Sequence, residues 1–208
     1  MRIKYPWAVP GDTKMSRQAR AAANLRQELA TTFPGVKFSV RSDSASMTSS
    51  VDYGWTLGPT GDEVRAIADK YAYGRFDGMT DYASEDTSIL GEAVEKVLGR
   101  ARYVQGSRHI PEDVREKVGR LLCEAQQVDY EDCKAGRVRL QGQNDSRWLD
   151  DHVNILLSRT TFPPDPDITG IAWSNGGYDE TTGAEHENGY YLTFSEPTTT
   201  IEVRWNEF

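Results

Sequence analysis

The chain has 208 residues, of which 38% are hydrophobic and 10% aromatic, and this apolar content excludes an intrinsically disordered protein. Two cysteines, Cys123 and Cys133, are too few for a disulfide scaffold. No apolar stretch is long enough for a signal peptide or a membrane span. We therefore expect a cytoplasmic protein with reduced cysteines and no membrane partner.

The charge differs between the two ends of the chain. The net charge of -8 argues against a general affinity for nucleic-acid phosphates. Residues 1–75 nevertheless contain 11 basic and 7 acidic residues, whereas the last 49 residues contain nine acidic residues and one basic residue, Arg204. Such an asymmetry indicates either an interaction surface or an acidic, solvated surface that keeps the protein soluble.

The first predicted elements are a helix and a hairpin. Alanine and leucine recur at helical spacing from Ser16 to Phe33, before a Pro-Gly pair that ends the run. Residues 36–42 and 50–57 alternate apolar and polar side chains, and the polar segment 43–49 between them predicts a loop. We expect two strands that pair as a hairpin.

A second helix is predicted directly after this hairpin. Thr60 stands three residues before Glu63, which is the spacing of a capping box, and apolar residues follow at helical spacing. The first part of the chain thus predicts a unit of helix, strand, strand and helix.

Three segments of this unit carry a family resemblance. They are Phe33-Pro-Gly-Val-Lys-Phe-Ser-Val-Arg-Ser42, Ser49-Ser-Val-Asp-Tyr-Gly-Trp-Thr-Leu-Gly-Pro-Thr60 and Phe76-Asp-Gly-Met-Thr-Asp81. In this order they resemble the large polyvalent protein associated domain of the twenty-ninth type, over about residues 13–95. The family is a module of long multidomain proteins of phages and conjugative plasmids. The resemblance implies a mobile-element protein that acts against host defence or handles incoming DNA, and it assigns no catalytic residues.

The second half predicts more helices and then strands. Helical apolar spacing marks residues 89–98, 111–125 and 145–157, and a proline-rich break follows at 162–167. Residues 168–174, 189–195 and 199–205 predict an antiparallel meander, with a long loop at 175–188. The predicted fold class is α+β, with one domain over residues 1–100 and a second, helical and then acidic and stranded, over 101–208.

Residues that could carry chemistry are few. His186 lies between two glutamates, but alternation along a strand would point it away from both, so we expect no metal site and no cofactor. Trp148 and His152 are four apart on a predicted helix and predict a stacked aromatic pair. Cys123 falls in an apolar stripe and predicts a buried thiol rather than a nucleophile. Motifs of NTPases, dinucleotide enzymes and zinc proteases are absent from the sequence.

The basic amino-terminal module is a candidate nucleic-acid surface. Arginines of the first helix and cations of the first strand could contact a single strand, with Tyr53 or Trp55 as stacking groups. The alternation, however, places both aromatic residues in phase with Val51 and hence on the core side. The candidate contacts of this module are Arg17, Arg20, Lys37 and Arg41.

The functional expectation combines the resemblance with the charge. We expect an inhibitor of a host defence complex, either a CRISPR effector or a restriction enzyme, that acts in the host cytoplasm, and nucleic-acid mimicry by acidic residues is one mechanism for it. The alternatives are a nucleic-acid-binding accessory protein that uses the basic module, and an enzyme of unknown type. The expected partner-binding residues are Asp179, Glu180, Glu185 and Glu187.

Overall fold

The computed structural model describes residues 8, 14–45, 48–72, 74–77, 82–85, 96–141, 146–163, 166–178 and 185–195. Within residues 45, 48, 74–77, 82–85, 173–178 and 185–188 the description covers the backbone. The chain divides into two compact units, unit 1 over Met1–His109 and unit 2 over Ile110–Phe208. Among the described residues, none of the helices has the length and hydropathy needed to cross a bilayer.

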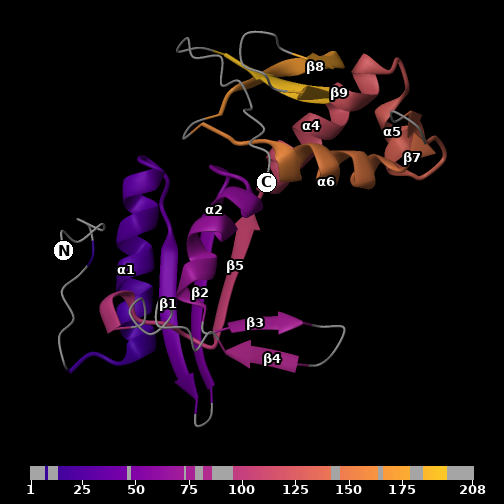
Figure 1. The fold of residues 1–208 in the computed structure, drawn as a ribbon. Coiled ribbons are helices and arrows are strands. Elements are labelled where there is room, and N and C mark those ends of the chain that lie inside the picture. Colours follow the sequence, from indigo (N-terminus) through magenta and orange to yellow (C-terminus); the bar gives the residue numbers. More distant parts are fainter. Residues whose placement is uncertain are drawn as a thin grey trace. The chain divides into compact units, whose positions relative to one another are not determined.

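Unit 1 mixes helices and strands, as predicted (Figure 1). Its elements are α1 (Arg17–Thr32), β1 (Ser39–Ala45), β2 (Thr48–Thr56), α2 (Gly61–Ala68), the 3₁₀ helix η1 (Asp69–Tyr71), β3 (Gly74–Asp77), β4 (Tyr82–Glu85) and β5 (Tyr103–His109).

Capping residues that the sequence places before α1 and α2 define where the two helices begin. The hydroxyl of Ser16 accepts the N–H of Ala19 at 3.3 Å and caps α1, whose small apolar stripe is buried. At α2 both bonds of the predicted capping box form, from the N–H of Glu63 to Oγ1 of Thr60 and from the N–H of Thr60 to Oε2 of Glu63. Of the predicted helix 89–98, residues 96–98 are described and are helical, and the remainder lies outside the described residues.

The sheet of unit 1 has the strand order β1-β2-β5. β1 and β2 form the predicted antiparallel hairpin, but the predicted loop at 43–49 is wrong, because the ladder continues to the pair Ala45 and Thr48. β5 pairs parallel to β2 from the pair Ser50 and Tyr103 onward. This third strand pairs with a segment about fifty residues earlier in the chain. Local sequence patterns do not predict such a pairing.

One face of this sheet forms the core of unit 1. Val51, Tyr53 and Trp55 of β2 are buried, together with Val40 of β1, and they pack with the apolar sides of α1 and α2. Figure 1 shows α1 and α2 beside the three strands. The placement of Tyr53 and Trp55 on the core side is confirmed.

Unit 2 is helical at its start and stranded at its end. Its elements are α4 (Glu112–Ala125), α5 (Tyr130–Lys134), β6 (Leu140–Gln141), β7 (Ser146–Arg147), α6 (Leu149–Arg159), β8 (Ile168–Tyr178) and β9 (Glu185–Phe194). The stripes predicted for residues 111–125 and 145–157 are buried at Val118, Leu122, Val153 and Leu157. α5, β6 and β7 were not predicted.

The antiparallel hairpin of β8 and β9 is longer than the sequence suggested. The ladder reaches the pair Tyr178 and Glu185, so most of the segment 175–188 predicted as a loop belongs to the two strands. The predicted third strand of the meander, residues 199–205, lies outside the described residues.

Candidate functional site

The two units differ in net charge. Residues 1–109 contain 15 basic and 13 acidic residues, whereas residues 110–208 contain 9 basic and 19 acidic residues. The net charge of unit 2 is therefore -10. This imbalance makes the surface of unit 2 the candidate site for a basic partner.

Most described cations of unit 2 are already engaged. Arg120 and Arg137 each lie 2.6 Å from a carboxylate, of Glu116 and Asp132 respectively. Lys117 lies 3.5 Å from Asp167, and Arg115 lies 4.0 Å from Glu112. The remaining cations include Arg139, whose guanidinium lies 4.4 Å from the ring centroid of Trp148. Several described acids of unit 2 take part in none of these ion pairs.

The first turns of α4 and α6 carry three such acids. Asp113, Asp150 and Asp151 are exposed, and none of them forms an ion pair with a described residue. Their position is locally favourable, because the free N–H groups at a helix N-terminus stabilise negative charge. The carboxylates are thus held in place while remaining open to a partner.

Two other carboxylates of unit 2, those of Glu116 and Asp167, have pKa values lowered by their neighbours. The hydrogen bond from Arg120 holds the pKa of Glu116 below its usual value, and the charge of Arg120 adds to this effect. The hydroxyl of Ser195 donates to Asp167 at 2.7 Å and lowers the pKa of Asp167, with a smaller contribution from Lys117. Both carboxylates are therefore ionised at neutral pH.

The structure describes two of the four predicted partner-binding acids, and for these two it describes the backbone. Asp179 and Glu180 lie outside the described residues. Glu185 and Glu187 belong to β9, in the part of that strand described by its backbone. They stand on a paired strand rather than in an irregular loop, because the backbone ladder extends to Glu185.

The basic residues of unit 1 fall into two groups, those that bond within the fold and those that are exposed. Nη1 of Arg20 donates to the carbonyl of Lys96 at 2.9 Å, and Arg26 donates to the carbonyl of Val40 on the outer strand β1. These two arginines hold the fold together. Arg17, Lys37 and Arg41 are exposed.

The proposed stacking role of Tyr53 and Trp55 is wrong. Their exposed fractions are 7% and 5%, and their rings stack on each other with centroids 6.0 Å apart. Nε1 of Trp55 donates to the carbonyl of Pro59 at 3.0 Å, which satisfies the indole in the core. Burial raises the pKa of Tyr53, and the charge of Asp69 raises it further.

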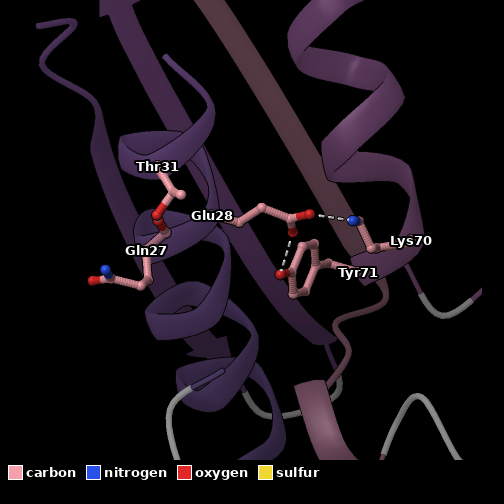
Figure 2. Close-up of polar contacts among 5 residues, drawn as sticks. All are labelled: Gln27, Glu28, Thr31, Lys70 and Tyr71. Carbon is pink, nitrogen blue, oxygen red and sulfur yellow. Dashed lines mark hydrogen bonds and ion pairs between the residues drawn. The ribbon is translucent and has the colours of Figure 1, made fainter. Parts of the chain in front are cut away.

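A buried carboxylate joins α1 to η1, which the sequence did not reveal. Glu28 is 8% exposed, and Figure 2 shows its two oxygens facing Lys70 and Tyr71. The hydroxyl of Tyr71 donates to Oε2 at 2.7 Å, and the ammonium of Lys70 forms an ion pair with Oε1. Each oxygen of the carboxylate thus bonds a side chain of η1. This cluster is a structural link between two elements.

The two cysteines lie together in unit 2. Both are free and buried, and burial together with a hydrogen bond to Cys133 raises the pKa of Cys123 to about 12. A thiol with this pKa is a poor nucleophile at neutral pH. Cys123 is thus buried as predicted.

The predicted stacking of Trp148 on His152 is not found. A ring nitrogen of His152 lies 3.2 Å from the carbonyl oxygen of Leu140, and Trp148 packs against Arg139 instead. Among the described residues, no group of three or more His, Cys, Asp or Glu side chains is arranged to hold a metal ion.

Comparison with known proteins confirms the family resemblance. Residues 16–111 match the family model of large polyvalent protein associated domain 29. The match covers α1, the three-stranded sheet and α2, and so coincides with unit 1. No curated protein and no solved structure matches the chain. This part of the chain is therefore similar to a domain associated with large polyvalent proteins.

Proposed function

We propose that this protein is a mobile-element inhibitor that binds a host defence complex, a CRISPR effector or a restriction enzyme, through the acidic surface of unit 2. The observation that carries the proposal is the net charge of -10 on unit 2, in a chain whose residues 16–111 match large polyvalent protein associated domain 29. Defence complexes that act on nucleic acid carry basic channels, and carboxylates along a surface can occupy such a channel in place of phosphates.

The placement of the acids supports this proposal. Asp113, Asp150 and Asp151 are exposed and form no ion pair with a described residue, so binding would not have to break such a pair. Glu185 and Glu187 stand on β9, and Asp179 and Glu180 follow β8 directly in the sequence. The proposed contact surface therefore contains carboxylates from the hairpin and from two helix N-termini.

The basic module supports the alternative of general nucleic-acid binding less well. Two of its arginines, Arg20 and Arg26, bond to backbone carbonyls, and its two proposed stacking residues are buried. The net charge of unit 1 is only +2, so it adds little general attraction for phosphates.

The test measures protection of a target plasmid. Cells carrying either a CRISPR effector or a restriction enzyme, matched to a plasmid target, are transformed with and without this protein. We expect the protein to raise transformation efficiency in the presence of one defence system and to leave it unchanged in cells without any. No increase against any tested system of either class would contradict the proposal.

Charge variants test the surface. Reversal of Asp179, Glu180, Glu185 and Glu187 to lysine should abolish protection, because each reversal replaces an attraction to a basic channel by a repulsion. Exposed carboxylates contribute little to stability, so the variant should melt close to the parent.

A matched pair of variants separates the hairpin from the rest of unit 2. Glu185→Gln with Glu187→Gln, and Asp150→Asn with Asp151→Asn, each remove two negative charges. If the hairpin is central, the first pair weakens protection more than the second. A four-lysine variant that melts like the parent and still protects would remove the hairpin from the proposed surface.

A further inference from the structure

The two cysteines of unit 2 lie against each other. Cys123 stands near the end of α4 and Cys133 in α5, which packs against α4 (Figure 1). Their exposed fractions are 1% and 2%, and a hydrogen bond joins the two thiols. These are the only cysteines of the sequence, and neither is in a disulfide. A disulfide within one chain therefore has to join this pair.

A Schellman turn fixes the backbone on the side of Cys123. The N–H of Val128 donates to the carbonyl of Cys123 at 3.0 Å, and the N–H of Gln127 donates to the carbonyl of Glu124 at 3.0 Å. Gln127 has a φ of 59°, the left-handed conformation that this motif requires. Because the carbonyl of Cys123 itself accepts the closing bond, the chain reverses direction just after this residue.

A second set of bonds fixes the backbone on the side of Cys133. Oδ1 of Asp129 accepts the N–H of Asp132 at 3.0 Å and caps α5. The carbonyl of Asp129 accepts the N–H of Cys133 at 3.2 Å, and the carbonyl of Cys133 accepts the N–H of Gly136 at 3.0 Å. Backbone bonds thus hold both cysteines in place at the two ends of the short segment 123–133.

This arrangement favours a disulfide between the two thiols. A disulfide places its sulfur atoms about 2 Å apart, so thiols that already share a hydrogen bond need only a small approach of their side chains. The entropy of bringing the two cysteines together is lost when the chain folds and is not lost again on oxidation. At equilibrium, the folded chain should therefore be oxidised more readily than the unfolded chain.

Two other roles fit the pair less well. A structural zinc site needs four ligands, and among the described residues no third His, Cys, Asp or Glu completes a metal-binding group with the thiols. Nucleophilic catalysis needs an accessible thiolate. Both thiols are buried, and burial together with the hydrogen bond to Cys133 raises the pKa of Cys123 to about 12. Oxidation differs from catalysis because it needs only a brief opening of the structure.

We propose that Cys123 and Cys133 form a reversible disulfide that links α4 to α5 when the chain meets a low-molecular-weight disulfide such as oxidised glutathione. α5 has five residues, and the residues on either side of Cys133 are partly or fully exposed, so this helix opens more readily than the longer α4. The inference does not rest on the proposed function, since it concerns the chemistry of the chain itself.

The exchange takes two steps. In the open form the thiol of Cys133 loses its proton to water and attacks one sulfur of the oxidant, so that a mixed disulfide forms and one glutathione leaves. When α5 closes again, the thiol of Cys123 loses its proton and attacks the sulfur of Cys133, and the second glutathione leaves. Two thiols of the chain are oxidised, and one disulfide of the reagent is reduced to two thiols. The reagent itself never has to reach Cys123.

The test places the full chain in mixtures of reduced and oxidised glutathione, in buffer and, in parallel, in urea that unfolds it. Acid stops the exchange, and mass spectrometry separates the dithiol, the intramolecular disulfide, the glutathione adducts and the dimers. We expect the ratio of intramolecular disulfide to dithiol to be at least about tenfold higher in the folded chain than in urea. An excess of reduced glutathione should restore the dithiol.

Variants test the order of the steps. Asp129→Ala removes the cap of α5, so the helix opens more often and oxidation of the folded chain should be at least about threefold faster. Asp129→Asn is the matched control, because it loses the same charge and keeps a capping side chain. Cys123→Ser should stop at the glutathione adduct of Cys133, whereas Cys133→Ser should stay unmodified. Melting curves confirm that each variant is folded.

Three outcomes would count against these inferences. A ratio in the folded chain no higher than in urea would overturn the disulfide, because the contact of the thiols would then not suit its geometry. A predominance of dimers or of glutathione adducts in the parent chain would overturn it as well. Equal rates in Asp129→Ala and Asp129→Asn would overturn the opening of α5 as the route. The comparison of buffer with urea uses the parent chain, so it decides the question even where a substitution unfolds unit 2.

Discussion

Removal of the buried carboxylate of Glu28 should destabilise unit 1 strongly. Glu28 bonds the ammonium of Lys70 and the hydroxyl of Tyr71, and Tyr71 is fully buried. In Glu28→Ala the hydroxyl of Tyr71 loses its acceptor without access to water, and Lys70 loses its counter-charge. Breaking a buried ion pair costs about 3–5 kcal/mol. Because the side chain of Lys70 is 30% exposed and can reach water, we expect the lower part of this range.

The two partners should contribute unequally. Tyr71→Phe removes one hydrogen bond to a charged acceptor, which is worth about 1.5–3 kcal/mol. Lys70→Met leaves the buried carboxylate of Glu28 with the hydroxyl of Tyr71 but without its counter-charge, so it should cost more than Tyr71→Phe, about 3 kcal/mol. Glu28→Gln places an amide N–H₂ or a carbonyl against two donors, so it can satisfy only one of them and should lie between Tyr71→Phe and Glu28→Ala.

The measurement is urea unfolding followed by far-UV circular dichroism, with hydrogen exchange of the α1 amides to assign the change to unit 1. Gln27→Ala is the matched control, because Figure 2 shows the side chain of Gln27 directed away from the cluster on the same helix. It should change the free energy of unfolding by less than about 0.5 kcal/mol. The double variant of Glu28 and Tyr71 should cost less than the sum of the single variants, by about 0.5–3 kcal/mol. A loss in Glu28→Ala no larger than in Gln27→Ala, or strict additivity, would refute the structural link.

Three further predictions concern a glycine, a thiol and a carboxylate. A Cβ on Gly106 would lie 2.0 Å from Cε2 of Tyr53, so Gly106→Ala should destabilise unit 1 by about 1–3 kcal/mol in urea unfolding. Gly61→Ala is the control, because a Cβ there meets no atom within 4 Å, and it should be neutral or stabilising. With a pKa of about 12, Cys123 has a thiolate fraction of about 10⁻⁴ at pH 8, so it should react with a disulfide reagent only after unfolding, and prompt reaction in the folded chain would contradict its burial. The pKa of Asp167 is lowered, so its contribution to stability is present above its ordinary pKa of 3.8 and is lost as the pH falls through the folded value; in an NMR titration Ser195→Ala should raise this pKa toward 3.8, and an unchanged titration would exclude the hydroxyl as its main cause.

Elements set by local signals could be predicted from the sequence. α1 combines a cap at Ser16 with an apolar stripe, and α2 has the capping box of Thr60 and Glu63, so each can be recognised within one or two turns. The inward positions of β2 were predicted for the same reason, because Val51, Tyr53 and Trp55 are strongly apolar and alternate. These signals need no knowledge of a distant segment.

β5 escaped prediction because its inward positions are unusual. Val104 is apolar, but Gly106 makes room for the ring of Tyr53 and Arg108 turns to the carbonyls after β2. The period of two is therefore not visible in its hydropathy. The polar ends of β1 and β2 were expected to be a loop for a related reason, since Ser44 and Asp43 are both exposed and show no alternation.

The candidate sites depended on partners that sequence spacing does not reveal. Arg20 and Arg26 look like free cations on a helix, yet each finds a backbone carbonyl outside its own helix, on Lys96 and Val40. Glu28 looks like a solvated acid, yet it meets Lys70 and Tyr71 more than forty residues later. Which charges remain available to a ligand depends on such long-range pairs, and sequence spacing does not reveal them.

The charge of unit 2 makes the proposed function depend on named carboxylates. If the inhibitor acts by occupying a basic channel, variants of Glu185 and Glu187 should lose protection and keep the melting temperature of the parent. A variant that loses protection and stability together would indicate that the substitution disturbs the fold instead of the contact.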